Sequence, residues 1–433
     1  MGICTRALGA GLLMAATAGP AVAGGGYFAL GYGPLARQMA GAGTAMTGDA
    51  FAGASNPAKL VTAGNRLDIG AELFMPRRRI EREGSGTPYD FSSHSRNSLF
   101  VIPEAAWSHQ VNDRLAVGLT FYGNGGLNTE YNDTVDAPNL NPGRCGSRPA
   151  NFFLGCGRAG SDLTQLILAP TAAWRVDGRH AIGVAPLLAV QRFEAYGLQA
   201  FAPLSKYPRD VTNNGVDTAL GAGMRVGYLG ELTPWLTVGA AYATRVYMQD
   251  FERYRGLLAD GSFDIPENFS VGVALRPHAR LTVALDVQRI NFGAVNSLGN
   301  SVLATLTDPA GNPLGSSGGT GFNWRSSNVY RLGLSFQARP DLAVRAGYAY
   351  GRRPNDDSIE SVTLNLLTPN PRHQFSVGLS WQPNERHELH LAASRFVLQT
   401  YKGPSATALL GVGGRESIEP EVHTVMLAWS WRL

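Results

Sequence analysis

The sequence predicts an all-β protein, a transmembrane antiparallel β-barrel, and three observations lead to this fold class. Apolar and polar residues alternate with period 2 in many short segments, as in strands that have one face in lipid. Short turns alternate with long polar connections along the chain. Only 16% of the residues are charged, against about 25% in an average soluble domain. Much of the surface is therefore expected to face something other than water.

The first 23 residues have the features of a secretory signal peptide. Arg6 gives a positive start, Ala7 to Gly19 form an apolar core, and Ala21-Val22-Ala23 supply a cleavage site of small residues. The alternative is an N-terminal anchor helix, but the apolar run is shorter than the roughly 20 residues that a membrane span needs. We expect the mature chain to begin near Gly24, with a formal charge of 4 − 1 = +3 once Arg6 is removed.

Residues 24–62 differ from the rest of the chain in pattern and composition. They lack the period-2 alternation and consist mainly of Gly, Ala and short polar residues. Small residues let a backbone pack closely against other surfaces. Asn56 before Pro57 suits a helix N-cap followed by proline at the first helical position. This segment is predicted to be a hatch, a plug of short helical turns inside a barrel formed by residues 63–433.

Strict alternation begins at Arg66. Apolar side chains fall on one face, and Arg66, Asp68 and Glu72 fall on the other. Such a strand belongs between lipid and a polar or plugged lumen. The pattern recurs near residues 115–122, 182–190, 281–287, 375–381 and 423–433. After the leader, the longest apolar run is about half of what a membrane helix needs, so no such helix is predicted.

The connections between these segments predict the topology. Short turns are expected at residues 112–114, 177–179, 232–235, 276–280, 339–341 and 382–387. Long connections are expected at residues 76–97, 123–161, 197–215, 249–267, 293–327, 351–372 and 402–419. Six turns and seven long connections join about fourteen strands, an even number with both barrel ends on the periplasmic side. The chain is therefore expected in the outer membrane of a Gram-negative cell.

Of the three cysteines, Cys4 leaves with the leader, whereas Cys145 and Cys156 lie eleven positions apart in a loop rich in Gly, Pro and Asn. In an exported protein such a pair predicts a disulfide. A metal site is not expected, because the other potential ligands are scattered, and His387 and His390 are interpreted as part of a solvated turn. No cofactor motif and no nucleophile motif is present.

The hatch resembles that of a known family, the FadL/TodX-type outer-membrane transporters of fatty acids and hydrocarbons. The matching segments are the aromatic start Tyr27-Phe28, then Gly41-Ala42-Gly43, Asp49-Ala50 and Asn56-Pro57-Ala58. Further similar segments follow in the family's order at residues 123–131, 263–266, 321–324 and 345–348. Lys59 is a departure, because the family usually has Gly there.

The resemblance implies passive uptake of hydrophobic compounds, above all long-chain fatty acids. The ligand is captured among the external loops, enters a pocket beside the hatch N-terminus, and moves on when the hatch shifts. By resemblance, Tyr27 and Phe28 lie at that pocket, and Asn56-Pro57-Ala58 fix the hatch. A buried carboxylate needs a cation, and Arg37 and Lys59 in the hatch are the candidates for it. Aromatic or alkane hydrocarbons, the alternative ligands, would need none.

A hydrophobic ligand gains nothing by entering water, because exposing each CH₂ costs about 0.8 kcal/mol. We therefore expect sideways exit into the bilayer through a gap between strands. Family members have a kink in the third strand, which here runs from Leu115 into Gly123-Asn124-Gly125-Gly126. The alternative is that these glycines simply begin the following loop.

The expected partners are a long-chain fatty acid or another hydrophobic small molecule, together with lipopolysaccharide and outer-membrane lipid. Nucleic acid is not expected, and the barrel is expected to be a monomer. Two other function classes stay open at this point. One is a lipid-modifying enzyme that uses Ser394 and His373 on neighbouring strands, although nothing in the sequence orients them, and the other is an adhesin or structural barrel.

Overall fold

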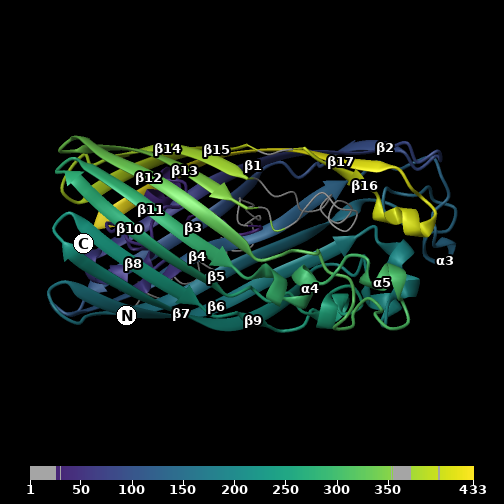
Figure 1. Ribbon diagram of the computed structural model, residues 1–433, viewed down its shortest axis with the longest axis horizontal. Helices are drawn as coiled ribbons and strands as arrows, with labels where there is room; N and C mark the ends of the chain where they lie inside the picture. Colours follow the sequence, from purple (N-terminus) through teal and green to yellow (C-terminus); the bar gives the residue numbers. More distant parts are fainter. Residues whose placement is uncertain (1–25, 30, 353, 355–371, 398–399) are drawn as a thin grey trace, which may run out of the picture.

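The protein is a closed antiparallel barrel of fourteen long strands. Figure 1 shows the barrel from the side, with its long axis horizontal. The computed structural model describes residues 26–29, 31–352, 354, 372–397 and 400–433. The predicted signal peptide and most of the expected loop at residues 351–372 lie outside these residues. The barrel closes where β1 (Arg66–Glu83) pairs with β17 (Arg415–Arg432) over the full length of both strands.

The other twelve strands follow one another around the wall, each paired with its neighbours in the chain. They are β3 (Phe100–Gln110), β4 (Leu115–Tyr131), β5 (Ala159–Arg175), β6 (His180–Tyr196), β7 (Asp217–Thr233), β8 (Leu236–Ala243), β10 (Asn268–His278), β11 (Leu281–Ile290), β12 (Ser327–Arg339), β13 (Leu342–Gly351), β14 (His373–Trp381) and β15 (His387–Val397). Three short strands, β2 (Phe91–His94), β9 (Tyr247–Met248) and β16 (Tyr401–Pro404), pair with the outer parts of β1, β7 and β17.

All six predicted turns join strands at one end of the barrel, where the C-terminus also lies, and the long connections gather at the other end (Figure 1). Several strands run further outward than expected. β1 continues to Glu83, although a loop was predicted from residue 76. The outward residues of β1 change there from apolar to charged, beginning with Arg77 and Arg79. This change marks the edge of the membrane, and the strand continues beyond that edge.

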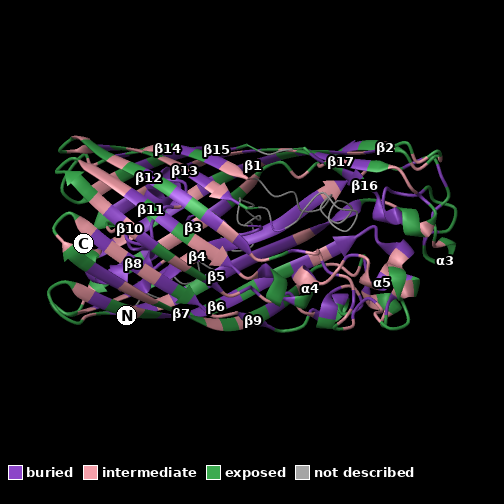
Figure 2. Cartoon of the chain, in the orientation of Figure 1, coloured by how far each residue is buried: buried purple, intermediate pink, exposed green. Residues whose placement is uncertain are grey.

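The outer surface has the pattern of a wall in lipid. Figure 2 shows buried and exposed residues alternating along the strands. Large apolar side chains are exposed on the outward face, for example Ile69, Leu188 and Val377. Six of the seven tryptophans lie on strands or turns at the short-turn end: Trp107, Trp174, Trp235, Trp381, Trp429 and Trp431. This is the aromatic girdle expected at a membrane interface. Among the described residues, no helix has the length and apolar content to cross a membrane.

The hatch contains α2 (Pro34–Gln38) and the 3₁₀ helices η2 (Phe51–Ala54) and η3 (Pro57–Thr62). The Asn56 side chain accepts a hydrogen bond from Ala58 N and so caps η3, with Pro57 at the first position. The Asn56 amide also donates to Thr44 O at 2.9 Å and to Tyr228 O on β7 at 2.8 Å. The Asn56 side chain thus caps a helix, links two parts of the hatch and links the hatch to the barrel wall.

Glycines on the inward faces of the strands bring the hatch into direct contact with the wall. A Cβ added at Gly347 would lie 2.1 Å from Met39 C, and one at Gly183 would lie 2.4 Å from Pro57 C. Both neighbours are backbone atoms, which cannot move aside. Gly227, Gly239, Gly272, Gly333 and Gly378 make similar close contacts with the hatch. The hatch therefore fits against a belt of wall glycines.

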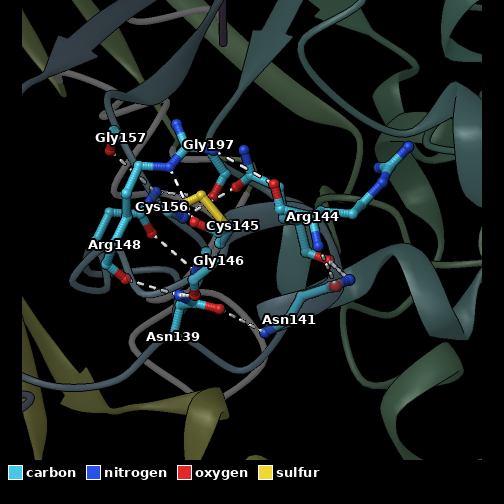
Figure 3. The surroundings of a disulfide bond; sticks show 12 residues. Asn139, Asn141, Arg144, Cys145, Gly146, Arg148, Cys156, Gly157 and Gly197 are labelled. Atoms are coloured by element: carbon cyan, nitrogen blue, oxygen red, sulfur yellow. Dashed lines mark hydrogen bonds between the residues drawn. A yellow bond between two sulfur atoms is a disulfide. The ribbon is translucent and has the colours of Figure 1, made fainter.

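The long connections fold over the other end of the barrel and form short helices there (Figure 1). These are α3 (Pro142–Cys145), α4 (Asn296–Gly299), α5 (Ala304–Thr307), η4 (Gln199–Leu204), η5 (Pro208–Asp210), η6 (Glu252–Tyr254), η7 (Ala259–Gly261), η8 (Phe292–Ala294) and η9 (Ala406–Leu410). A disulfide joins Cys145 to Cys156, with Cα atoms 5.9 Å apart (Figure 3). Asn139 donates to the carbonyls of Gly146 and Arg148 and closes the same turn.

We predict that Gly347→Ala destabilises the barrel by about 1–3 kcal/mol, because the added methyl group overpacks against hatch backbone. Urea unfolding in detergent micelles, followed by tryptophan fluorescence, measures the change. Gly178→Ala is the matched control, since a Cβ there meets nothing within 4 Å. Equal unfolding curves for the two variants would contradict a hatch seated on glycine.

We predict that replacing both loop cysteines by serine loosens the loop by about 2–3 kcal/mol, because the short ring no longer restricts the open chain. Tryptic cleavage after the exposed Arg144 should then become tens of times faster, while uptake changes little. Mass spectrometry of timed digests gives the rate. Two free thiols in oxidised, unfolded wild-type protein would contradict the disulfide. An unchanged cleavage rate in the serine variant would contradict its role in holding the loop.

Candidate functional site

An apolar pocket lies among the long connections. It has a cavity volume of about 100 Å³. Phe153, Phe193, Phe201, Phe263 and Phe322 contribute rings to its wall. Leu, Val and Ala side chains complete most of the rest, with a few Ser and Thr hydroxyls. None of the described residues that line the pocket is charged. The pocket can therefore hold a small apolar molecule.

An aromatic cluster built around the start of the hatch lies behind this pocket and joins it through Phe263. Tyr27 is fully buried and Phe28 nearly so. The Tyr27 ring lies 5.8 Å from that of Phe263 and 6.1 Å from that of Trp324. Phe292 contacts Tyr27, Phe28 and Trp324. Phe263 belongs both to the pocket wall and to this cluster, so Tyr27 stands directly behind the pocket.

The wall has a window beside the same residues. β3 and β4 pair only from Ala105↔Phe121 to Gln110↔Ala116, and outward of Phe121 the strand β4 keeps only its partner β5. Pro103, two residues beyond the last pair, has no N–H to donate to a neighbouring strand. Further out, Arg96 N donates to Glu130 O at 2.8 Å and rejoins the two sides. The interruption is thus bounded at both ends.

The hatch takes the place of β3 along this window. Ala29 N donates to Asn124 O at 2.9 Å, and Gly126 N donates to Tyr27 O at 3.3 Å. Between them, β4 has a bulge against β5 between Gly123 and Gly125. The segment 123–126 is therefore part of a strand, and it does not begin the following loop. Backbone groups of β4 that β3 leaves unpaired are thus satisfied by Tyr27 and Ala29 at the start of the hatch.

Gly125 cannot be replaced without moving the hatch. Its φ is +157°, and a Cβ there would lie 2.0 Å from Tyr27 O. At Gly123, an added Cβ would lie 2.8 Å from Ile102 Cγ2 across the window. The Tyr32 hydroxyl donates to Asn124 Oδ1 at 3.1 Å and adds a second link between hatch and β4. Glycine in this strand thus allows the close approach of the hatch.

Arg37 and Lys59, the two cations considered for a carboxylate, lie deeper, where the hatch meets the wall. Arg37 Nη1 is 2.7 Å from Glu72 Oε2, and Nη2 is 3.7 Å from Glu104 Oε2. Lys59 Nζ donates to Gly43 O at 2.7 Å inside the hatch. Burial lowers the pKa of Lys59 and raises that of Asp49, and the attraction between the two opposes both shifts. Neither cation lines the apolar pocket.

The residues considered for an enzyme do not form a site. Ser394 is buried and shares a 2.8 Å hydrogen bond with Ser376. His373 Nδ1 is instead 2.8 Å from the Tyr348 hydroxyl. Among the described residues, no three His, Cys, Asp or Glu side chains are grouped to hold a metal ion.

The sequence did not identify the loop residues that line the pocket. Phe153, Phe201 and Leu314 come from irregular connections, where no periodicity points to a shared cavity. Trp324 offered a signal in the sequence, because it is the one tryptophan away from the short-turn strands, and the structure shows it 1% exposed in the aromatic cluster.

Solved structures with this fold include outer-membrane channels. The chain is 17% identical to the toluene transporter TodX of Pseudomonas putida, with a TM-score of 0.69, 94% of this chain covered and 99% of that one. A FadL homologue from Pseudomonas aeruginosa gives 15% identity and a TM-score of 0.67 at the same coverage. The toluene transporter TbuX of Ralstonia pickettii gives 16% and 0.62, also at 94% and 99%. No curated protein sequence matches the chain significantly.

Residues 14–432 match the family described as outer membrane protein transport protein (OMPP1/FadL/TodX). The match spans nearly the whole chain, and the family's members are channels without enzymatic activity. The predicted fold class, resemblance and outer-membrane location are confirmed. The chain therefore belongs to the OMPP1/FadL/TodX family, and it is an outer-membrane channel for hydrophobic compounds.

Proposed function

We propose that this channel takes up small, uncharged hydrophobic compounds, with aromatic hydrocarbons as the first class to test. The observation that carries the proposal is the apolar pocket, whose described lining holds phenylalanine rings and no charge. Aromatic rings pack well against one another at the distances found here. Structures of the same fold are titled toluene transporters and a monoaromatic hydrocarbon channel, which supports this class of ligand.

Long-chain fatty acids, the ligand expected first from the resemblance, receive less support. None of the described lining residues is a cation, so a carboxylate in the pocket would lack a partner there, and burying an unpaired charge is costly. Arg37 is paired with Glu72, and Lys59 donates to a hatch carbonyl. We therefore propose that both residues anchor the hatch, together with Asn56-Pro57-Ala58.

The proposed route leads from the pocket past Tyr27 and Phe28 and sideways through the window between β3 and β4. Opening requires that residues 26–29, 31 and 32 leave β4, where two backbone hydrogen bonds and the Tyr32 hydroxyl hold the described residues. The rest of the hatch stays against its glycine belt. The apolar side chains Phe74, Phe100 and Ile102 pack together beside the window on β1 and β3. A greasy ligand would thus pass into lipid without crossing water.

We predict that vesicles containing the protein accumulate toluene several times faster than vesicles with an unrelated barrel, whereas dodecanoate enters at the background rate. Ala195→Trp places an indole in a cavity of about 100 Å³ and should abolish the difference. Ala393→Trp, on the outward face of β15, is the matched control. Radiolabelled ligand trapped after filtration is the measurement. Faster entry of dodecanoate than of toluene would refute the preference for uncharged ligands.

We predict that closing the window stops uptake. An Ile102→Cys/Gly123→Cys pair places two sulfurs within reach across it, since a Cβ at position 123 lies 2.8 Å from Ile102 Cγ2. Uptake should fall about tenfold or more when the pair is oxidised and return on reduction. His109→Cys/Val117→Cys is the control, because it joins positions that are already paired. Full uptake with the window locked would leave a route straight down past the hatch.

A further inference from the structure

We propose that Gln165 and Gln191, beside Tyr27, form a hydrogen-bonding site for a ligand hydroxyl group, directly behind the pocket. The inference rests on the proposed function and narrows the ligand class. Preferred compounds would be hydrophobic molecules that carry one neutral hydroxyl, such as phenols and alkanols. Pure hydrocarbons would still pass, but they would bind less tightly at this point.

Gln165 on β5 and Gln191 on β6 are register partners, and both point inward with no exposed surface. The orientation of each amide is fixed by a partner. Gln165 Oε1 accepts a hydrogen bond from Asn124 Nδ2 at 2.9 Å. Gln191 Nε2 donates to Phe263 O at 2.9 Å. Gln165 therefore keeps an N–H group of its amide nitrogen as a free donor, and Gln191 keeps its amide oxygen as a free acceptor among the described residues.

These remaining atoms have no hydrogen-bond partner within the described part of the chain. They are an N–H group of Gln165 Nε2, a donor, and Gln191 Oε1, an acceptor; the Tyr27 hydroxyl faces the Gln165 amide and interacts with at most one of its two N–H groups. Most buried polar side-chain atoms in proteins do have partners. A donor and an acceptor left over on adjacent register partners therefore fit a visiting group. A hydroxyl fits best, because it can accept from Gln165 and donate to Gln191 at the same time.

The site lies on the proposed route. Phe263 lines the pocket, contacts the Tyr27 ring at 5.8 Å and gives its carbonyl to Gln191. Ser161 lies four residues before Gln165 on the same inward face of β5. Its hydroxyl belongs to the pocket wall and is also without a partner among the described residues. When Phe263 moves aside, a ligand leaving the pocket would lose its hydrogen bond to Ser161 and form hydrogen bonds to the two glutamines.

The charges at this site favour a neutral hydroxyl over a carboxylate. A carboxylate can only accept hydrogen bonds, so it would leave Gln191 Oε1 unpaired and facing a second oxygen. Asp264, next to Phe263, acts on the Tyr27 hydroxyl through its negative charge, although Arg245 Nη1 lies 3.6 Å from its Oδ2 and offsets part of that charge. What remains of the charge disfavours a second anion. The site therefore discriminates by hydrogen bonding among uncharged ligands.

The test compares p-cresol with toluene, which differ by one hydroxyl. Equilibrium dialysis against the full-length mature protein in nanodiscs gives both dissociation constants, corrected with empty nanodiscs. We expect wild type to bind p-cresol about tenfold more tightly than toluene, the size of one good neutral hydrogen bond. Gln191→Leu should remove this preference, because it weakens p-cresol binding more than toluene binding. Gln165→Met tests the donor independently, in case one variant does not fold.

Gln374→Leu is the matched control, because Gln374 is another buried lumen amide with an unpaired oxygen, on β14. It should keep the preference for p-cresol. Heat-modifiable mobility on gels checks that each variant is a folded barrel. Equal binding of the two compounds by wild type, or equal losses for both compounds in Gln191→Leu, would overturn the inference while leaving the proposed function intact. Binding of neither compound by wild type would instead overturn the proposed function.

Discussion

Hydrogen bonding between the hatch and the wall is the constraint on which the rest of the structure depends. A barrel of this width has a lumen that must be filled by side chains, by water or by a plug. Here carboxylates on the wall accept hydrogen bonds from hatch backbone. Asp286 Oδ2 receives Gly43 N and Thr44 N at 2.7 and 2.8 Å, and Asp68 Oδ2 receives Ala50 N at 2.7 Å. Irregular backbone is thereby satisfied inside a membrane protein, as it must be.

The same constraint links the pocket to the window. Tyr27 and Phe28 belong to the aromatic cluster behind the pocket, and their backbone pairs with β4 where β3 no longer does. On the proposed route, a ligand that displaces the Tyr27 ring would also strain the backbone hydrogen bonds that the described hatch residues make across the window. Arrival of the ligand and opening of the wall would then be coupled without a movement of the whole hatch.

Much of the architecture could be predicted because it rests on local patterns. Period 2 in the strands, tight turns such as residues 112–114 and the Asn56-Pro57 cap each depend on neighbours in sequence. The strand at Arg66 showed a polar inward face, and Asp68 and Glu72 do meet the hatch. The end of β1 was misplaced because exposed charges on an outer strand look like loop residues.

The candidate site was predictable only in part, for a physical reason. The pairing of Gly125 with Phe28 joins residues about a hundred positions apart, and nothing local in the glycine run distinguishes a bulged strand from the start of a loop. The role of Arg37 shows the same limit. The charge of Arg37 suggested that it binds a ligand carboxylate. Whether it does so or pairs with Glu72 depends on which strand of the wall lies opposite Arg37.

The distribution of charge inside the barrel sets the kind of selectivity that this channel can have. Near the hatch, Arg66 pairs with Asp68, Arg37 pairs with Glu72, and Arg225 donates to Gly53 O. These charges hold the plug, so loosening one to bind a ligand would weaken the seal. The pocket lies on the other side of Tyr27 and has no charge in its described lining. Anchoring and recognition are thus carried by different chemistry, ion pairs for the first and apolar surface with neutral hydrogen-bonding groups for the second. Selectivity can then change through neutral residues such as Gln191 without loosening the hatch.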